Sequence, residues 1–320
     1  MIRATTTGGL IFALLLVATS AAAFAPGEVY WAPGACDSPP CAAHEVDASS
    51  GTAASLAVVD VAPGQIAWST DRAYAFVSQF TPDTIVRISP AGVVSGFADG
   101  IDGPTGLLVT SGGTFLAASY YDGTVYDATL GGDLSQAPVF ATGFQTPRNL
   151  LELSTGEILL ADQNRRAVFD ISAGGGADFS AAQPFAWGFI TGVYDLVQAG
   201  TGRIYLSARY GVFDITGGGD FSSATPHANG RRFIGLTVDG SGRLLASEFQ
   251  TGNVFDITAA GDYTVASPVV TVTDGFGDSA LDTVPDGVTA GPPEVPVLSP
   301  LAYGVLSFLL AVTGSGSRRR

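Results

Sequence analysis

The 320-residue sequence contains no lysine, one methionine, two cysteines and two histidines. All 14 basic residues are therefore arginines, and against 29 acidic residues they leave a formal net charge of −15. A surface of this sign repels phosphate backbones, so nucleic acid is not expected as a partner. Two cysteines alone cannot complete a tetrahedral zinc site, and with only two histidines in the chain a structural zinc site is not expected.

The histidines give no support to a Ser-His-Asp hydrolase. His44 falls in an expected N-terminal loop and His227 in a proline-flanked loop, and neither has an obvious nucleophile beside it. Because the base of such a triad must hydrogen-bond its nucleophile, this class of enzyme is excluded.

The first 23 residues have the organisation of a secretory signal peptide. One arginine near the start precedes an apolar run at residues 10–17, and small residues lead to a predicted cut after Ala23. The run is too short for a membrane span, which needs about 20 apolar residues. We therefore expect residues 1–23 to direct export. In an oxidising compartment, Cys36 and Cys41 of the string CDSPPC are expected to form a local disulfide, with two free thiols as the alternative.

Residues 292–320 form a tail with an apolar stretch at residues 298–312 and three terminal arginines. Positive charge after an apolar segment favours retention in the membrane, and a tail packed on the domain is the alternative. The string VPVLSP before this stretch resembles the bacterial C-terminal sorting tails of the IPTL and PEP type, although it differs from the commoner IPTLS at two places. That resemblance implies a periplasmic or cell-surface protein, anchored by its tail or released after the tail is processed.

Between these ends, a five-residue phrase recurs with a fixed period. VFDIS at residues 168–172 is followed by VFDIT at residues 212–216 and again at residues 254–258, and related strings begin at residues 45, 85 and 125. The steps between copies are 40 to 44 residues. A period of about 40 to 45 residues with short strands is typical of a β-propeller blade. The aspartate of the phrase is expected to bind backbone donors at the strand end. The glycine-rich strings that follow are interpreted as turns rather than calcium loops, because they lack a run of alternating oxygen ligands.

Two further strand sets follow the same phasing, and each has six members. The inner strands are expected to begin at Ile66, Leu107, Leu150, Leu196, Leu236 and Leu281. The last inner strand has no partner after it, whereas residues 27–59 offer three strands with no inner strand before them. Pairing residues 279–287 with residues 27–59 would close a ring and remove an open sheet edge. The sequence therefore predicts one all-β domain over residues 24–291, a six-bladed β-propeller.

This blade pattern, over residues 28–287, resembles the NHL-repeat and SMP-30/gluconolactonase-like families. The lactonase resemblance implies a divalent cation such as Ca²⁺ in the central channel, held by a Glu, an Asn and an Asp near the starts of inner strands. The nearest matches are Gln65, Asn149 and Asp195, with Asp195 also the candidate catalytic carboxylate. Here the acid is replaced by Gln65, and the Asn and Asp lie one residue closer to the strand's leucine than in the family's NGL and DGL patterns. The metal site is thus a hypothesis.

Tyrosine and arginine gather in the loops that join the second and third strands, on the face where the inner strands begin. Such residues dominate binding hot spots. The candidate binding residues are Tyr120, Tyr121, Arg148, Arg165, Arg166, Tyr194, Arg209 and Tyr210. Two functions remain open: an envelope-associated module that binds a protein or a glycan, and a metal-dependent hydrolase of a lactone, with Asp195 activating water. The lost acid at position 65 favours the first.

Overall fold

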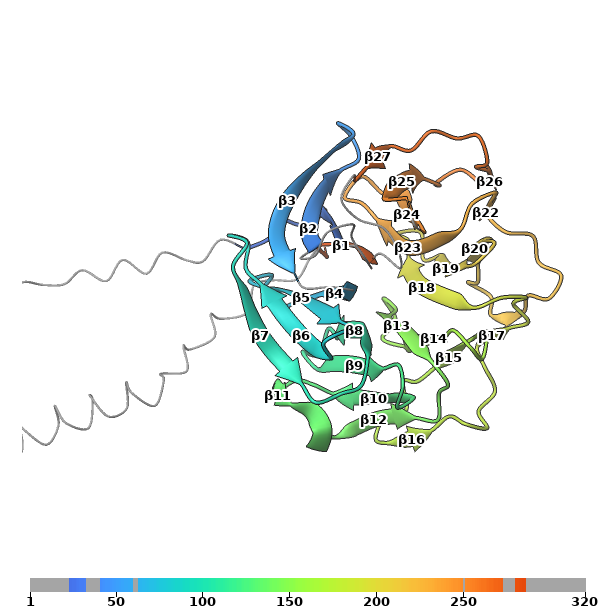
Figure 1. The fold of residues 1–320 in the computed structure, drawn as a ribbon. Helices are drawn as coiled ribbons and strands as arrows, with labels where there is room; N and C mark the ends of the chain where they lie inside the picture. The colour runs from blue at the N-terminus through green and yellow to red at the C-terminus, as the bar shows by residue number, and fades with distance from the viewer. Residues whose placement is uncertain (1–22, 33–40, 60–62, 250, 273–279, 286–320) are drawn as a thin grey trace, which may run out of the picture.

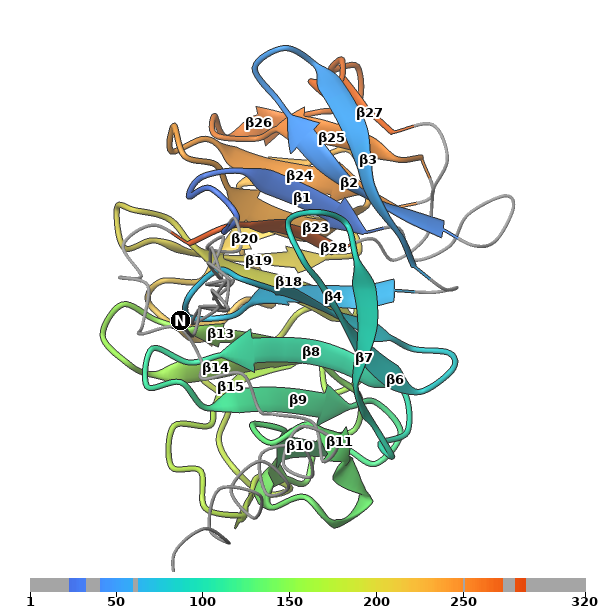
Figure 2. The same cartoon turned by 90° about the vertical axis from the view of Figure 1, so that its left-hand side faces the viewer.

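The computed structural model describes residues 23–32, 41–59, 63–249, 251–272 and 280–285. Their strands form six sheets set like blades around a central axis (Figure 1), and Figure 2 shows the same ring from the side. The predicted all-β six-bladed propeller is confirmed. The predicted signal peptide, the C-terminal tail and Cys36 lie outside the described residues. Within those residues, no helix is long and apolar enough to cross a membrane.

Each blade is a meander whose first strand lies at the axis. Blade 1 contains β4 (Pro63–Trp68), β5 (Ala75–Gln79), β6 (Thr84–Ile88) and β7 (Val94–Asp99). Blade 2 contains β8 (Pro104–Val109), β9 (Phe115–Ser119), β10 (Thr124–Asp127) and β12 (Val139–Thr142), with the short 3-10 helix η1 (Leu134–Gln136) before the last strand. Blade 3 contains β13 (Pro147–Glu152), β14 (Ile158–Asp162), β15 (Ala167–Asp170) and β17 (Ala186–Trp187).

The second half of the ring repeats this plan. Blade 4 contains β18 (Val193–Gln198), β19 (Ile204–Ala208), β20 (Gly211–Asp214) and β22 (Ala228–Asn229). Blade 5 contains β23 (Phe233–Val238), β24 (Leu244–Glu248), β25 (Asn253–Asp256) and β27 (Val270–Thr271). Blade 6 contains β28 (Ala280–Thr283), β1 (Val29–Ala32), β2 (Cys41–Asp47) and β3 (Thr52–Val59).

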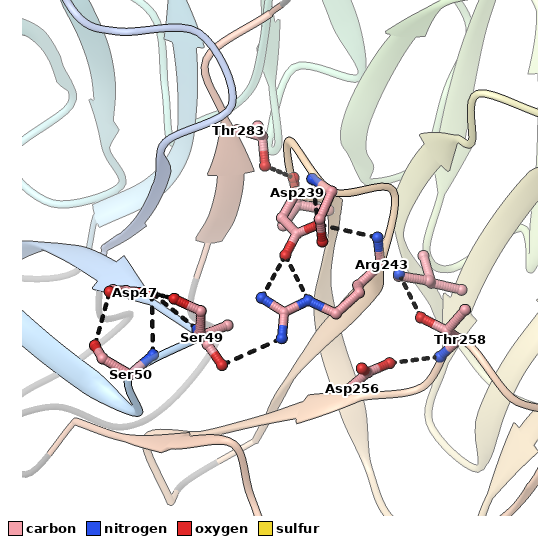
Figure 3. A network of polar contacts seen from close by, with 12 residues as sticks. Asp47, Ser49, Ser50, Asp239, Arg243, Asp256, Thr258 and Thr283 are labelled. Atoms are coloured by element: carbon pink, nitrogen blue, oxygen red, sulfur yellow. Dashed lines mark hydrogen bonds and ion pairs between the residues drawn. The ribbon is translucent and has the colours of Figure 1, made fainter.

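Blade 6 closes the ring with strands from both ends of the propeller sequence. Antiparallel pairing places Trp31 of β1 opposite Leu281 of β28, which confirms the predicted closure. Figure 3 shows how this blade is joined to blade 5: Arg243 donates to the Ala48 carbonyl and holds Asp239 by an ion pair of 2.7 Å. His44 lies in β2 and not in a loop as predicted from the sequence, because the β1–β2 pairing extends through it.

The aspartate of the repeated phrase has the predicted role. In β15, Asp170 accepts a hydrogen bond from the backbone N–H of Ser172, and the Ser172 hydroxyl in turn accepts one from the Ile158 N–H. The same relay recurs at Asp127, Asp214 and Asp256. Each relay satisfies backbone N–H donors where the end of the third strand lies beside the start of the second. The repeated phrase therefore serves the fold.

The glycine-rich strings are turns, as predicted, but they also supply strands that the sequence did not reveal. Four two-residue strands add a fifth, parallel strand to the sheet of the preceding blade: β11 (Gly132–Asp133), β16 (Ala177–Asp178), β21 (Gly219–Asp220) and β26 (Gly261–Asp262). In β11, Asp133 Oδ1 accepts from Ser135 N at 2.9 Å and lies against Gly100 at the end of blade 1, where a Cβ would overlap it. We call this arrangement the interblade latch.

The hydrophobic core lies between blades. One cluster joins Leu116 of blade 2 to Leu160 and Phe169 of blade 3, and all three are fully buried. The next joins Leu159 of blade 3 to Leu206 of blade 4. Because these side chains alternate along strands, each blade packs on both neighbours and the axis is left to the inner strands.

Candidate functional site

One face of the ring carries both the loops between second and third strands and the starts of the inner strands. In four blades a backbone hydrogen bond ties the two together: Tyr120 N to Gly103 O, Gln163 N to Thr146 O, Arg209 N to Gly192 O, and Phe249 N to Arg232 O. These bonds are 2.8 to 3.3 Å long. The residues predicted for binding therefore share a face, although they do not form one cluster.

Alternating aromatic and arginine side chains run along this face from blade 1 to blade 5. The Arg148 guanidinium lies 5.8 Å from the Tyr120 ring centroid and 5.7 Å from that of Tyr194. The Tyr120 ring also meets Phe80 edge-on at 5.3 Å and Tyr121 at 5.1 Å. Tyr121 leaves 61% of its surface exposed.

The row of alternating side chains continues with Arg232 and Phe249, which were not among the candidate binding residues predicted from the sequence. The Arg232 guanidinium lies 5.8 Å from the Tyr194 ring centroid and 3.4 Å from that of Phe249. We call Phe80, Tyr120, Tyr121, Arg148, Tyr194, Arg232 and Phe249 the arginine–aromatic arc. The sequence offered a signal in the FQTG string at Phe249 and in the paired arginines before β23, but nothing in it distinguished Arg232 from its neighbour.

Other predicted arginines serve the fold. Arg165 donates to the carbonyls of Gly143, Phe179 and Ser180 at 2.7 to 3.3 Å and covers the Phe169 ring. Arg166 donates to the Ile190 carbonyl at 3.1 Å. Arg209 lies 5.8 Å from the ring of the exposed Tyr210, apart from the arc.

The channel holds the three residues predicted to bind a cation. Gln65, Asn149 and Asp195 directly precede Ile66, Leu150 and Leu196 in their inner strands, close to a shift in the pairing register. A bulge of this kind re-aims a side chain, which explains why the one-residue offset from the family pattern does not turn them away from the axis. All three line one cavity of about 260 Å³. Blades 2 and 5 have Gly106 and Gly235 at this position.

Burial dominates the electrostatics of Asp195. Its carboxylate accepts hydrogen bonds from Leu196 N at 2.9 Å and from Leu236 N at 2.7 Å. Both bonds, together with Gln65 and Arg148 nearby, favour the charged form, but desolvation outweighs them and raises the pKa of Asp195 to about 7. The Gln65 side chain lies near enough to the Asp195 carboxylate to hydrogen-bond it, which lowers the pKa of Asp195.

A second carboxyl lines the same cavity, which the sequence did not single out. Burial, and then the neighbouring charge of Asp195, raise the pKa of Asp282 to about 8. Trp68 lies close enough to lower this pKa, and within the described part of the chain its buried Nε1 has no hydrogen-bond partner. Asn149, 3% exposed, likewise has its Oδ1 buried without a hydrogen-bond partner among the residues that the structure describes. The cavity therefore combines two carboxyls that resist ionisation with an acceptor that lacks a donor.

These groups fit a divalent cation poorly. Two of the three predicted ligands are neutral amides, and both oxygens of the third, Asp195, already accept backbone N–H groups. In the described part of the chain, no group of three or more His, Cys, Asp or Glu side chains is placed to hold a metal ion. A hard cation such as Ca²⁺ prefers several charged oxygens. Within the described residues, the Asn149 oxygen that has no donor is a feature that suits a ligand of this kind.

The fold defines the class of protein: a six-bladed β-propeller whose channel and loop-rich face carry its polar and aromatic groups. No protein-family model matches the sequence, and no curated protein matches it. Among solved structures, a chain from a nidogen/laminin complex aligns with a TM-score of 0.58 at 13% identity, over 81% of this chain and 99% of that one.

The solved neighbours also include gluconolactonases. The periplasmic gluconolactonase of Pseudomonas aeruginosa aligns with a TM-score of 0.49 at 16% identity, over 72% of this chain and 78% of that one. A gluconolactonase from Xanthomonas campestris aligns with a TM-score of 0.47 at 18% identity, over 62% and 73%. At these identities and TM-scores the likeness assigns no activity to this chain.

Proposed function

We propose that this protein is an exported binding module of the bacterial envelope, which holds a protein or glycan ligand on the arginine–aromatic arc. The observation that supports the proposal most directly is the set of contacts that the Arg232 guanidinium makes. Its side chain is half-buried with the guanidinium 3.4 Å over Phe249, and within the described residues its one hydrogen bond runs from Nη2 to the Tyr194 hydroxyl at 3.4 Å. A guanidinium held in place with unused donors on its terminal nitrogens can receive an acceptor from outside.

The surroundings of Arg232 support this function. Arginine and tyrosine are enriched among residues that dominate binding energy, since they combine a large contact area with fixed polar geometry. Exposed Tyr121 and Tyr210 add aromatic surface to the same face. The solved neighbour with a TM-score of 0.58 comes from a complex between two proteins, nidogen and laminin, which fits a scaffold used for recognition.

Binding is tested by calorimetric titration of the purified exported protein against envelope glycan fragments and synthetic peptides. Arg232→Gln and Tyr121→Ala should each weaken binding of whichever probe binds by about 10-fold or more, as for hot-spot residues. The matched control is Arg203→Gln on the opposite face, where Arg203 is 59% exposed and forms an ion pair of 3.3 Å with Asp214. Equal losses in all three variants, or none in the first two, would contradict the proposal.

The cavity favours one second candidate, hydrolysis of a lactone. A carboxyl whose pKa is about 7 is suited to act as a general base near neutral pH, and the free Asn149 oxygen lies in the same cavity. Activity would then rise as pH increases through about 7, as Asp195 loses its proton. Hydrolysis of δ-lactones that disappears in Asp195→Asn and persists in Leu130→Ala, a change at an exposed site, would establish this second function.

A further inference from the structure

The lining of the channel cavity carries acidic groups and no basic one. Glu152, Asp195 and Asp282 line it, and none of the described lining residues is Arg or His. Glu152 is engaged by the backbone N–H and the hydroxyl of Ser111, whereas Arg148 acts on Asp195 from outside the lining. Because a buried carboxylate without a positive partner is unfavourable, a cationic ligand would balance the charge of this cavity.

The Asp195 and Asp282 carboxyls lie close to each other at the axis. They come from the inner strands β18 and β28, which lie on either side of β23. Asp195 Oδ2 accepts the Leu236 N–H of β23, and the residue before Leu236 is a glycine, which adds no side chain between the two carboxyls. The charge of Asp195 raises the pKa of Asp282, so one cation in the cavity can interact with both.

Two further features of the lining point to a ligand that is partly apolar and brings hydrogen-bond donors. Asn149 is 3% exposed, and its Oδ1 has no donor among the described residues, so a donor supplied by a ligand is favoured. Asp282 directly follows the first aliphatic residue of its inner strand. At the same position, blades 2, 3 and 4 have partly exposed apolar residues that line the cavity: Leu108, Leu151 and Val197.

We propose that the channel binds a small organic ammonium ion, with its N–H groups on the Asp195 and Asp282 carboxylates and its apolar part on the leucine and valine side chains. An ammonium ion donates up to three hydrogen bonds, whereas Ca²⁺ requires about six to eight oxygens. The lining that suits a divalent metal poorly therefore suits this cation. The net charge of −15 also attracts cations to the protein.

The size of the cavity limits the ligand. Its volume of about 260 Å³ is below the roughly 300–1,000 Å³ of pockets that hold drug-sized molecules. A single ring or a short alkyl chain attached to the ammonium group is therefore expected. This inference does not rest on the proposed function, because the arc contributes none of the groups that would contact the cation.

The test titrates benzylammonium and its neutral counterpart, benzyl alcohol, into the full-length protein by calorimetry. At pH 8 the cation should bind at least about 10-fold more tightly than the alcohol, because only the cation pairs with carboxylates. With a pKa of about 7, Asp195 is about one-tenth ionised at pH 6 and about nine-tenths ionised at pH 8. Binding of benzylammonium should therefore tighten about 10-fold over this range, whereas binding of benzyl alcohol should not change.

Matched variants place the cation in the cavity. Asp195→Asn and Asp282→Asn keep the shape of the side chain and should each weaken benzylammonium binding about 10-fold or more at pH 8. Glu157→Gln removes the same charge at an exposed site outside the cavity and should bind as the wild type does. Arg232→Gln should also leave this affinity unchanged, which tests the channel separately from the arc.

The outcomes separate this site from the proposed function. Equal binding of the cation and the alcohol, or no saturable binding of the cation at pH 8, would overturn the inference. Binding that both aspartate variants leave intact would do the same, because the cation would then lie elsewhere on the acidic surface. Displacement of benzylammonium by Ca²⁺ at lower concentration would identify a metal site instead. Failure of the arc variants to change glycan or peptide binding would overturn the proposed function alone.

Discussion

The interblade latch makes a prediction about Gly100 and Asp133. Gly100 has φ of +82° at the end of blade 1, and a Cβ there would overlap Asp133 Oδ1 of blade 2. The other nearest atoms, Ser135 N and Leu134 N, lie at 3.0 and 3.1 Å, which is tight but tolerable. Gly100→Ala should therefore force the Asp133 carboxylate away and leave the Ser135 N–H without its acceptor.

The expected cost has two parts. An L-residue at this φ loses about 1–2 kcal/mol. A backbone donor without its acceptor costs about 1 kcal/mol more. Asp133→Ala alone should cost about 1 kcal/mol, as for the loss of a capping side chain. Since the hydrogen bond can be lost only once, the double variant should be about 1 kcal/mol more stable than the two single effects added together.

Urea unfolding of the four proteins in this cycle measures that coupling. Gly113→Ala is the matched control, because Gly113 has φ of +85° and no atom within 4 Å of its added Cβ. It should carry the cost of the φ angle alone and show no coupling with Asp133→Ala. The latch would be refuted if Gly100→Ala cost no more than Gly113→Ala and its effect simply added to that of Asp133→Ala.

Three further predictions concern pH, a structural arginine and the tail. The pKa values of Asp195 and Asp282 are raised to about 7 and 8, against 3.8 in the unfolded chain, so the folded state binds more protons. The contribution of these two groups to the free energy of unfolding should therefore be largest below pH 4 and decline up to about pH 8. Asp282→Asn should flatten this slope in thermal melts across that pH range. Arg165→Ala should destabilise the protein by about 2 kcal/mol in urea unfolding, because it leaves three carbonyls without their donor. Ligand binding should not change. Altered ligand binding at unchanged stability would show that Arg165 contacts the ligand. Deletion of residues 296–320 should release the protein from the membrane fraction, and unchanged association after fractionation would show that the tail is no anchor.

The sequence predicted those features that depend on local pattern. A period of 40 to 44 residues and alternating apolar positions within each repeat were enough for six blades, and the unmatched strands at the two ends were enough for the closure between β28 and β1. The aspartate relay was also predictable, because Asp127 and Thr129 are only two residues apart and interact within one turn.

Features that depend on contacts between blades were not predictable in this way. The fifth strands pair residues about 34 positions apart, such as Gly132 with Ala98. The glycine-rich strings that contain them recur with the repeat, but two residues are too few to show the alternation of a strand. Arg231 donates to the Tyr263 carbonyl and Arg232 to the Tyr194 hydroxyl, and this difference likewise depends on which groups lie near each guanidinium. Asp282 escaped notice because its neighbour in the cavity, Asp195, comes from a blade on another part of the ring.

The direction of the latches has a consequence for the order in which the ring assembles. Every fifth strand reaches back to the blade made just before it, so blades 1 to 5 can be joined one after another as the chain emerges. In the described residues, no such strand covers the sheets of blades 5 and 6. Strands β1 to β3 are synthesised first, but their sheet is complete only when β28, which is synthesised last, pairs with β1. This pairing closes a loop that contains all the other blades, and contacts so far apart in the sequence form slowly. Blade 6 is thus the seam of the ring, the last part to form and the part where hydrogen exchange should first detect opening.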